Sequence, residues 1–496
     1  MISYCLPYPG KVVSPLTFFT FMEELSELLQ LRHQKLEAWR QLGIDPFGSA
    51  YPDALTTQEV IDGFEENKTV RVAGRLVSIR DMGKSVFAHI QDQYGKFQIY
   101  ANKQSLGDDV FAYWKLLDIG DFVGGEGTLF TSKSGEKTIK LSSLRLLSKS
   151  LRPIPSQWYG LSDVEARYRQ RYVDMIVSED ARKTLLLRSR IVREVRNFFE
   201  ARGFNEVETP MMQAVAGGAA AQPFVTHHNA LNIDLFLRIA PELYLKRLLV
   251  GGMGKIFELN RNFRNEGISR KHNPEFTMLE AYWAFADFEM MAQLVEELIT
   301  TVAEKVMGTL VVGPTQIDLT RPWPRKKYND CITDVAGADW FQLTPEGRRA
   351  KAAELGVEIG PDLVDFEVTN QVYEKLVEAK QKNPLFVTHL PKELVPLARQ
   401  NTEDSSVVDV YELIMAGQEI SPGYSELNNP IVQRERLLEQ SGGEKMDLDE
   451  DFLAALEYGM PPAGGIGIGI DRLAMVLTGA ESIRDVLLFP LLKPKA

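Results

Sequence analysis

The sequence predicts an α+β fold in two parts, a small β-barrel and then a larger antiparallel sheet flanked by helices. Short strands of alternating polarity fill the stretch after residue 68, a pattern typical of a small barrel. Long helical periods and strands that directly follow one another fill the rest, which favours antiparallel pairing over a doubly wound sheet. The net charge also differs between the two parts: residues 68–150 are basic, with 13 Lys and Arg against 8 Asp and Glu, whereas the rest of the chain is acidic.

The composition is that of an ordinary globular protein and excludes several other classes. The chain has 496 residues, of which 44% are hydrophobic and 25% charged, as in ordinary globular proteins. Cys5 and Cys331 are its only cysteines, which excludes a disulfide framework and suits a reducing cytoplasm. No apolar run reaches the ~18 residues that span a membrane. The net charge is −12 overall but +5 over residues 68–150, so this module is expected to bind a polyanion, a solvated surface being the alternative.

Two segments precede the barrel. Residues 1–21 are expected to form a disordered extension, and residues 22–64 a helical segment. The helix repeats apolar side chains at a helical period from residue 23 to residue 42, before Gly43, which can end it. The helix is expected to pack on a neighbouring element, to present its basic side chains to an RNA, or to do both; these side chains are Arg32, Lys35 and Arg40.

An OB-type barrel is predicted over residues 65–150. Five strands alternate apolar and polar side chains, and a short helix over residues 109–117 separates the third strand from the fourth, as in barrels of this type. The expected strands cover residues 70–80, 85–91, 97–101, 121–130 and 138–147. Residues 151–165, which include two prolines, are expected to be a linker.

The larger part is expected over residues 166–496. Long helices are predicted at residues 181–202 and 287–307. The predicted strands cover residues 255–263, 276–285, 407–416 and 465–470. Because several strands are consecutive, the sheet is expected to be antiparallel. A polar, helix-rich stretch over residues 340–383 has the character of an insertion.

Two groups of residues in the larger part point to a nucleotide. Arg264 ends a strand of a predicted hairpin and offers a cationic fork for a phosphate or carboxylate, and Phe276 on the second strand can stack on a purine. After Gly464, glycine and isoleucine alternate from Gly465 to Ile470 and lead through Arg472 into a helix. Such a strand has one bare face on which a flat ligand can lie. For either group alone, a surface hairpin or close packing is the alternative.

A third group is acidic. Glu412 and Glu419 lie on strands joined by a turn near Gly417, and Glu426 follows on the second strand. Carboxylates without a nearby Cys or His cluster suit Mg²⁺ held jointly with phosphates, although an isolated pair more often faces water. No phosphate-binding loop of the Gly-Lys-Ser/Thr type follows a glycine-rich stretch. The three groups together therefore predict ATP chemistry without such a loop, and the basic barrel adds RNA.

The sequence around these groups resembles the class II aminoacyl-tRNA synthetases, and more specifically the bacterial lysyl-tRNA synthetases. The resemblance runs from about residue 22 to the C-terminus. Residues 203–210 (GFNEVETP) are similar to motif 1 of class II, the loop after Arg264 to motif 2, and residues 467–472 to motif 3. Residues 226–230 (THHNA) and 240–247 (APELYLKR) match the lysyl subfamily.

The resemblance implies a fold, a reaction and partners. It implies an antiparallel class II catalytic sheet, an OB-fold anticodon-binding domain, and a cytoplasmic homodimer with motif 1 at its interface. The implied reaction uses ATP and Mg²⁺. L-lysine and ATP give lysyl-adenylate and pyrophosphate, and lysine then passes to the 3′ end of tRNA(Lys).

The resemblance also implies roles for residues of this chain. Arg264 would bridge the α-phosphate and the lysine carboxylate, and Arg472 would hold the γ-phosphate, so these two are the expected catalytic residues. Glu412 and Glu419 would place Mg²⁺ on the polyphosphate. The further ATP ligands are expected to be Glu266, His272, Asn273 and Phe276.

The implied lysine site is rich in carboxylates. Glu242 and the backbone of Gly217 would take the α-amino group. The side-chain ammonium would be received at the end of the pocket by Glu280, Tyr282, Tyr424 and Glu426. A neutral analogue would leave buried charge unpaired there, so the site is expected to reject it. A structural ion pair is the alternative for each carboxylate taken singly.

In the barrel, the resemblance points to anticodon-reading positions. Phe87 would stack on an unpaired base while Gln98 and Glu136 read its edge, with Arg80 in support. These residues would favour the uridine-rich lysine anticodon. Burial of Phe87 in the barrel core is the competing interpretation.

One position departs from the family pattern. Pro422 stands where the family has an asparagine whose amide helps to hold the substrate carboxylate. Proline has neither a side-chain donor nor a backbone N–H, so weaker lysine binding is expected unless Ser421 compensates. Two alternatives stay open: a paralogue that transfers lysine to a protein, which the barrel opposes, and a non-catalytic tRNA-binding relative, which the retained site residues oppose. Glu280 and Glu426 oppose aspartate or asparagine specificity.

Overall fold

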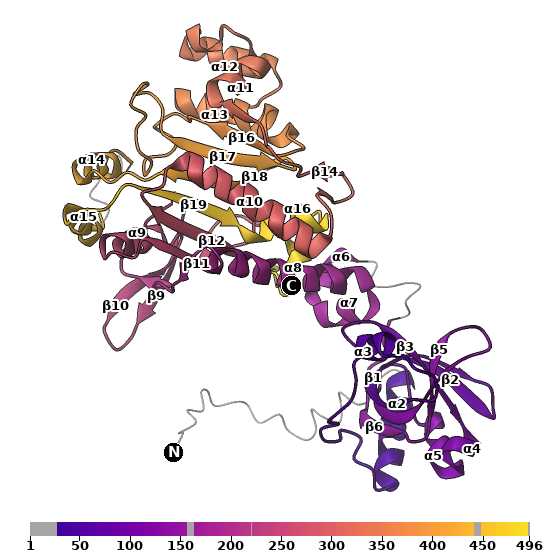
Figure 1. Cartoon of the computed structure of the whole chain (residues 1–496). Coiled ribbons are helices and arrows are strands. Elements are labelled where there is room, and N and C mark those ends of the chain that lie inside the picture. The colour runs from indigo at the N-terminus through magenta and orange to yellow at the C-terminus, as the bar shows by residue number, and fades with distance from the viewer. Residues whose placement is uncertain (1–26, 156–162, 220, 441–447, 495–496) are drawn as a thin grey trace. The chain divides into compact units, whose positions relative to one another are not determined.

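The computed structural model describes residues 27–155, 163–219, 221–440 and 448–494. The extension expected over residues 1–21 lies outside these ranges. The chain divides into two compact units, Met1–Gly160 and Leu161–Ala496 (Figure 1). Each unit has a hydrophobic core of its own. Within the described ranges, no helix is long and apolar enough to cross a membrane.

The N-terminal unit is a closed six-stranded barrel. β1 pairs with both β2 and β4, which closes the sheet in the order β1-β2-β3-β5-β4-β6. Neighbouring strands are antiparallel except β3 and β5. The strands are β1 Thr69–Asp81, β2 Ser85–Gln91, β3 Lys96–Asn102, β4 Phe122–Thr131, β5 Lys137–Leu141 and β6 Arg145–Ser148. Along each strand alternate side chains enter the core, as the sequence pattern predicted.

Two expectations for the barrel were wrong in detail. The single strand expected over residues 138–147 is two strands, β5 and β6. The chain turns between them because the Ser142 and Ser143 amides both donate to the Glu126 carbonyl, at 2.8 and 3.2 Å. The single helix expected over residues 109–117 is two shorter elements, α5 Asp108–Ala112 and the 3₁₀ turn η1 Tyr113–Lys115, and a further short helix, α4 Lys103–Leu106, precedes them.

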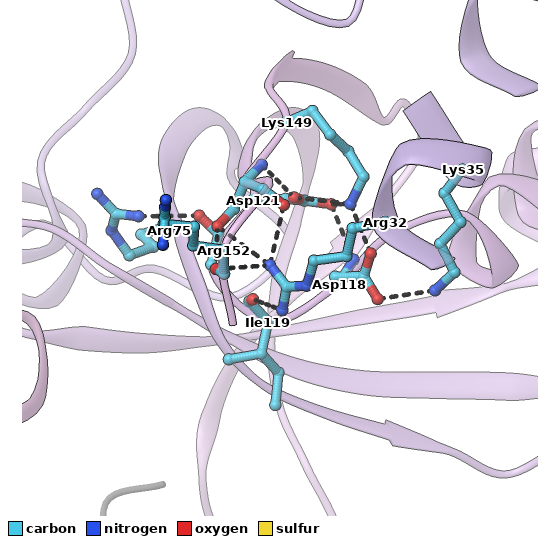
Figure 2. Close-up of polar contacts among 10 residues, drawn as sticks. Arg32, Lys35, Arg75, Asp118, Ile119, Asp121, Lys149 and Arg152 are labelled. Atoms are coloured by element: carbon cyan, nitrogen blue, oxygen red, sulfur yellow. Dashed lines mark hydrogen bonds and ion pairs between the residues drawn. The ribbon is translucent and has the colours of Figure 1, made fainter. Parts of the chain in front are cut away.

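Helix α2 (Glu27–Gln41) packs on the barrel, and one of its basic side chains is buried there. Arg32 is only 5% exposed. Its guanidinium donates to the main-chain oxygens of Ile119, Ser150 and Arg152, at 2.9, 2.9 and 3.0 Å (Figure 2). One arginine thus joins the helix, the loop before β4 and the chain that leaves the barrel. A second short helix, α3 (Thr57–Asp62), follows α2.

Ion pairs surround this arginine (Figure 2). Lys35, one helical turn along α2, pairs with Asp118 at 2.7 Å. Lys149 is buried and lies 2.6 Å from Asp118 and 2.9 Å from Asp121. Of the two uses that the sequence left open for Arg32 and Lys35, packing on a neighbouring element is therefore confirmed.

The C-terminal unit is built on an eight-stranded sheet in the order β15-β16-β17-β18-β19-β12-β11-β7. The pairing is antiparallel apart from the two edge pairs, β15 with β16 and β7 with β11, as the sequence predicted for most of the sheet. Its strands are β7 Asn205–Glu206, β11 Lys255–Phe263, β12 Glu275–Ala284, β15 Arg325–Lys327, β16 Leu385–Thr388, β17 Val410–Met415, β18 Gln418–Ser425 and β19 Ala463–Gly469.

Helices cover this sheet and bury its larger core (Figure 1). α10 packs on β17, β18 and β19, and α16 packs on β12 and β19. Helices α11 to α13 form a separate core with β16 and β17. Of these elements, α12 and α13 lie within residues 340–383, the stretch expected as an insertion. The helices are α6 Val164–Arg169, α7 Arg171–Val177, α8 Glu179–Glu200, α9 Glu242–Val250, α10 Phe288–Met307, α11 Tyr328–Ala336, α12 Pro345–Glu354, α13 Asp365–Leu376, α14 Pro430–Gln440, α15 Glu450–Glu457, α16 Ile470–Thr478 and α17 Ile483–Val486.

Smaller elements complete the C-terminal unit. A three-stranded sheet in the order β8-β10-β9 precedes α9. It and the remaining short elements were not expected from the sequence: β8 Met212–Gln213, β9 Phe224–His228, β10 Ile233–Leu237, β13 Val311–Val312, β14 Ile317–Asp318, η2 Trp340–Gln342 and η3 Glu378–Lys380.

Candidate active site

A cavity of about 190 Å³ lies over the strands at the middle of the large sheet. Its walls come from the loop between β11 and β12, from β18, and from the start of α16. Seven residues expected at the ATP and metal site line it: Arg264, Glu266, His272, Asn273, Phe276, Glu419 and Arg472. Residues more than 200 positions apart in the sequence are therefore brought to one cavity.

Arg264 presents its guanidinium at the cavity wall beside an aromatic ring. Its Cζ lies 5.2 Å from the centroid of Phe276, and its buried Nε has no hydrogen-bond partner. Burial lowers the pKa of Arg264, and Glu266, Glu280 and Glu419 oppose that shift. An unpaired buried donor is costly unless an acceptor completes it, so the residue fits an anionic ligand.

Arg472 is held from two sides at the start of α16. Its Nη1 donates to the main-chain oxygen of Glu419 at 2.9 Å, and its Nη2 lies 3.1 Å from His272 Nε2. Burial and the neighbouring Arg472 lower the pKa of His272, so Nε2 of the neutral ring accepts from the guanidinium. His272 Nδ1 then donates to Ser269, 2.8 Å away. His272 therefore orients Arg472 as well as lining the cavity.

The acidic pair lies on neighbouring strands, as the sequence predicted. Glu412 on β17 and Glu419 on β18 flank the turn at Ala416 and Gly417, which both have positive φ. Glu412 accepts a hydrogen bond from Tyr373 at 3.0 Å. Burial, and then the charge of Glu419, raise the pKa of Glu412 well above its usual value.

No group of three or more His, Cys, Asp or Glu in the described ranges is close enough to hold a metal by itself. The pair fits a hard cation that takes its remaining oxygen ligands from phosphates or water.

The carboxylates expected at the lysine ammonium lie together on one face of the sheet. Glu280 and Tyr282 are two residues apart on β12, and the Tyr282 hydroxyl donates to Glu280 at 3.0 Å. Tyr424 and Glu426 come from the end of β18, and Tyr424 donates to Glu242 at 2.9 Å. Four of these five side chains are less than 9% exposed. The fifth, Tyr424, is hydrogen-bonded to one of them, Glu242.

Lys246, for which the sequence suggested no role, lies in the middle of this cluster. Its Nζ is 2.7 Å from Glu242 and 2.5 Å from Glu426. Although burial opposes the shift, these two carboxylates raise the pKa of Lys246 above its usual value. Its four-residue spacing from Glu242 on α9 was the available signal, but the contact with Glu426 is long-range.

The cluster holds more carboxylates than cations. Lys246 and Arg238, which lies 2.6 Å from Glu258, stand among four buried carboxylates: Glu242, Glu258, Glu280 and Glu426. Burial raises the pKa of Glu280 and of Glu426 to about 8. A buried site with excess negative charge favours a cationic ligand, and Glu426 Oε1 has no hydrogen-bond partner.

The glycine face of β19 is occupied by neighbouring side chains, which corrects the expectation of a bare floor for a flat ligand. A Cβ at Gly465 would overlap Glu426 Oε1 and lie 2.8 Å from Tyr282. A Cβ at Gly467 would lie 2.5 Å from the end of Met278. The glycines make room for the residues of β12 and β18, and only Gly469 of the alternate positions lines the first cavity.

A second cavity, of about 460 Å³, adjoins the carboxylate cluster. Gly217, Glu242 and Tyr424 line it, so three of the expected lysine ligands meet there. Glu280, Tyr282 and Glu426 line neither cavity and are buried. Both oxygens of Glu242 accept hydrogen bonds, one from Lys246 and one from Tyr424.

Pro422 lines the first cavity with Arg264. Ser421 does not line it. Its side chain is fully buried and interacts with Tyr411 on the neighbouring strand. The compensation by Ser421 that the sequence left open is therefore not available from this geometry.

The four positions expected to read an anticodon lie on one face of the barrel. Phe87 is outside the barrel core, since its neighbours Val86 and Ala88 fill that core instead. It stands opposite Arg80 on β1. Gln98 Nε2 donates to Glu136 at 2.6 Å. The competing interpretation of Phe87 as a core residue is thus wrong.

Two further residues near the first cavity were missed. Lys271 lines the cavity and donates to the Gly417 carbonyl at 2.5 Å. Arg188 on α8 lies 2.6 Å from Asp471 and 3.0 Å from Thr277, which fixes the start of α16 to β12. Lys271 lies in the loop that resembles motif 2, so the sequence alone could have identified it. The contacts of Arg188 could not be foreseen, because they depend on the tertiary fold.

Comparisons with known proteins agree with this geometry. Residues 163–493 match the family model described as class II tRNA synthetases (D, K and N), and residues 70–147 match an OB-fold nucleic acid binding domain. The chain is 52% identical over 484 residues to the lysine–tRNA ligase of Carboxydothermus hydrogenoformans, covering 95% of this chain and 99% of that protein. It is 50% identical to that of Pelotomaculum thermopropionicum (95% and 96% covered) and 46% identical to that of Staphylococcus saprophyticus (95% and 100% covered).

Proposed function

Since the chain belongs to the class II aminoacyl-tRNA synthetases and, within them, to the lysine–tRNA ligases, we propose which of its residues carry each part of the reaction. The chain activates L-lysine with ATP and transfers lysine to tRNA. The excess of buried carboxylates around Lys246 is the observation that best supports lysine as the amino acid.

Activation is assigned to the first cavity. A lysine carboxylate oxygen attacks the α-phosphorus of ATP, and the bond from that phosphorus to the bridging oxygen breaks to release pyrophosphate. Arg264 would contact both the lysine carboxylate and the α-phosphate and neutralise charge as it develops. No general base is required, because the carboxylate is ionised at neutral pH. In the second step, a hydroxyl at the tRNA 3′ end attacks the lysyl carbonyl and AMP leaves.

The remaining groups of the cavity would bind the rest of ATP. Arg472, oriented by His272, would hold the γ-phosphate. Phe276 would stack on adenine, with Glu266 and Asn273 at its edge. The Oδ1 of Asn273 is buried without a partner, which supports a ligand there. Glu412 and Glu419 would hold Mg²⁺, which would supply charge neutralisation on the polyphosphate.

Lysine recognition is assigned to the carboxylate cluster. Glu280, Tyr282 and Glu426 would receive the side-chain ammonium, and Glu242 with Tyr424 and Gly217 would hold the α-amino end. A neutral side chain would leave these carboxylates uncompensated in a buried site. The same reasoning disfavours an acidic amino acid more strongly.

The setting of the enzyme is part of the proposal. We infer a cytoplasmic homodimer with residues 203–210 at its interface. The barrel is assigned to the anticodon of tRNA(Lys), with Phe87, Gln98, Glu136 and Arg80 as its ligands. Its net positive charge supports this assignment.

Amino-acid-dependent exchange between ATP and pyrophosphate tests the site, with each of the twenty amino acids in turn. Exchange with lysine alone is expected. Exchange with another amino acid would show that the ammonium pocket is wrongly assigned. Exchange with none would overturn the catalytic roles of Arg264 and Arg472. Charging of tRNA(Lys) transcripts then separates tRNA acylation from transfer to a protein acceptor.

A further inference from the structure

Five polar residues form one chain of hydrogen bonds across the outer face of the barrel. Ser78 Oγ lies 2.8 Å from His89 Nδ1, and His89 Nε2 lies 2.8 Å from Glu136 Oε1. Gln98 Nε2 lies 2.6 Å from the other oxygen of Glu136. Thr138 Oγ1 lies 2.8 Å from Gln98 Oε1. Neither the sequence nor the proposed function supplies a role for Ser78, His89 or Thr138, and of these three His89 is the one that bonds to the Glu136 carboxylate.

The direction of this chain is fixed by chemistry. An ionised Glu136 can only accept, so both His89 Nε2 and Gln98 Nε2 must donate to it. In the neutral ring, whose single N–H is then at Nε2, His89 Nδ1 accepts from the Ser78 hydroxyl. Rotating the Gln98 amide would place its oxygen 2.6 Å from a carboxylate oxygen, which is repulsive. The amide orientation is therefore decided by its neighbours.

Strand register places this polar row beside an aromatic one. His89 is opposite Ser78 on β1 and Gln98 on β3. Two residues along β2, Phe87 is opposite Tyr100, with ring centroids 4.8 Å apart. The Glu136 side chain remains 44% exposed. A base stacked on Phe87 would therefore meet the edge of the polar row.

We propose that His89 is a positioning residue for base reading, which holds the Glu136 carboxylate and, through it, the amide of Gln98. The row then presents a carboxylate acceptor beside the second N–H of Gln98. This pair complements an unpaired pyrimidine whose edge has an N–H donor next to a carbonyl acceptor, as uridine has at N3 and O4. The inference rests on the proposed anticodon roles of Phe87, Gln98 and Glu136.

A half-exposed glutamate needs such support. Its side chain is long and flexible, and ordering it for binding costs conformational entropy. A hydrogen bond from His89 orders it before RNA arrives. Loss of that bond is expected to weaken discrimination between the correct and incorrect base by about tenfold, the scale of one hydrogen bond to a charged group.

The test uses the full chain and anticodon stem-loop RNAs that differ only by uridine or cytidine at each anticodon position. His89→Ala is expected to reduce the ratio of the two dissociation constants about tenfold at one position. His89→Gln is expected to restore most of the ratio, because its amide can donate to Glu136 and accept from Ser78. His33→Ala, which removes the other histidine of this unit, is the matched control and is expected to keep the wild-type ratio.

The outcomes are distinguishable. If His89→Ala weakens binding of both RNAs equally, or if His89→Gln fails to restore the ratio, His89 has only a structural role and the inference is wrong. Gln98→Ala and Phe87→Ala test the proposed site itself. If these two variants keep the wild-type ratio, the anticodon assignment and the inference fall together. If they lose it while His89→Ala keeps it, only the inference falls.

Discussion

At the scale of single residues, the proposed lysine site holds more buried carboxylates than cations. Lys246 pairs with two carboxylates at once, Glu242 and Glu426, and Glu280 accepts a hydrogen bond from the phenol hydroxyl of Tyr282. Burial raises the pKa of two of these carboxyls, Glu280 and Glu426, to about 8, and the charge of Glu242 adds to both shifts. The amino-acid site should respond to pH in the range in which these groups ionise.

Lysine affinity is expected to rise with pH between about 6.5 and 8.5. The ionised fraction of Glu280 and Glu426 rises over this range because burial raises their pKa values to about 8, and an ionised carboxylate attracts an ammonium more strongly than a neutral carboxyl does. The lysine ammonium itself stays charged up to about pH 10. Titration calorimetry of lysine binding measures the trend, and Glu426→Gln should flatten it and weaken binding at least tenfold. The rising affinity would be contradicted by a dissociation constant that does not change over this range.

Pro422→Asn is expected to lower the lysine KM by about tenfold, the scale of a hydrogen bond to a charged group. Pro422 lines the cavity of Arg264 and brings no donor, whereas an asparagine amide could reach the lysine carboxylate. Lysine-dependent exchange between ATP and pyrophosphate measures the KM, and the KM for ATP serves as the internal control. An unchanged lysine KM would mean that the proline costs this enzyme nothing.

At the scale of elements, β19 contributes to the proposed lysine site through its glycines, which leave space for side chains from the neighbouring strands. Gly465 and Gly467 face the same side of the sheet, where residues of β12 and β18 fill the space. The two positions differ in what an added methyl group would meet. Glu426 and the Tyr282 ring lie beside Gly465, whereas the flexible end of Met278 lies beside Gly467.

Gly465→Ala is therefore expected to abolish lysine activation, with a loss of kcat/KM above a hundredfold, because the new Cβ would displace Glu426. Gly467→Ala is the matched control on the same strand and is expected to cost less than tenfold, since the Met278 side chain can adjust. The kinetics of ATP–pyrophosphate exchange measure the loss of lysine activation in both variants, and thermal unfolding measures their loss of stability. Equal losses in the two would show that the strand matters only for packing.

Periodicity in the sequence predicted most elements of the fold. The alternation in β2 and the helical period of α10 are local and strong, so each was placed within one or two residues. The boundary between β5 and β6 was missed because it depends on two amides that bind Glu126 on another strand. The two-residue strands were missed because so short a pattern carries no period.

Of the candidate site, the sequence predicted those residues that stand in recognisable motifs. Arg264 and Arg472 stand in recognisable runs, and they meet in one cavity. The role of Lys246 was not predictable, because its second partner lies 180 residues away and only the folded sheet brings them together. Arg188 was missed for the same reason, since it acts through Asp471.

At the scale of the whole molecule, the two units have separate cores. Two tryptophans, Trp39 and Trp114, report on the core of the N-terminal unit. The contacts of Arg32 lie entirely inside this unit. A change at Arg32 should therefore act on the barrel and leave the core of the catalytic unit intact.

Arg32→Met is expected to destabilise the barrel by about 3 kcal/mol, because buried carbonyls would lose their donor. Arg40→Met, on the exposed side of the same helix and paired only with exposed Glu37, is expected to change stability by less than about 0.5 kcal/mol. Urea unfolding followed by tryptophan fluorescence measures both, while exchange activity reports on the other unit. Equal midpoints for the two variants would contradict the anchoring role of Arg32.

The anchor at Arg32 also bears on how this part of the sequence can diverge. Three of its acceptors are main-chain oxygens, at Ile119, Ser150 and Arg152, and a main-chain oxygen is present whichever amino acid occupies the position. Only arginine offers a planar fork of donors that can serve all three. The Ser150 hydroxyl also accepts from Arg32, at 3.1 Å. Homologous genes should therefore keep arginine at position 32 and favour serine at position 150, while positions 119 and 152 vary freely.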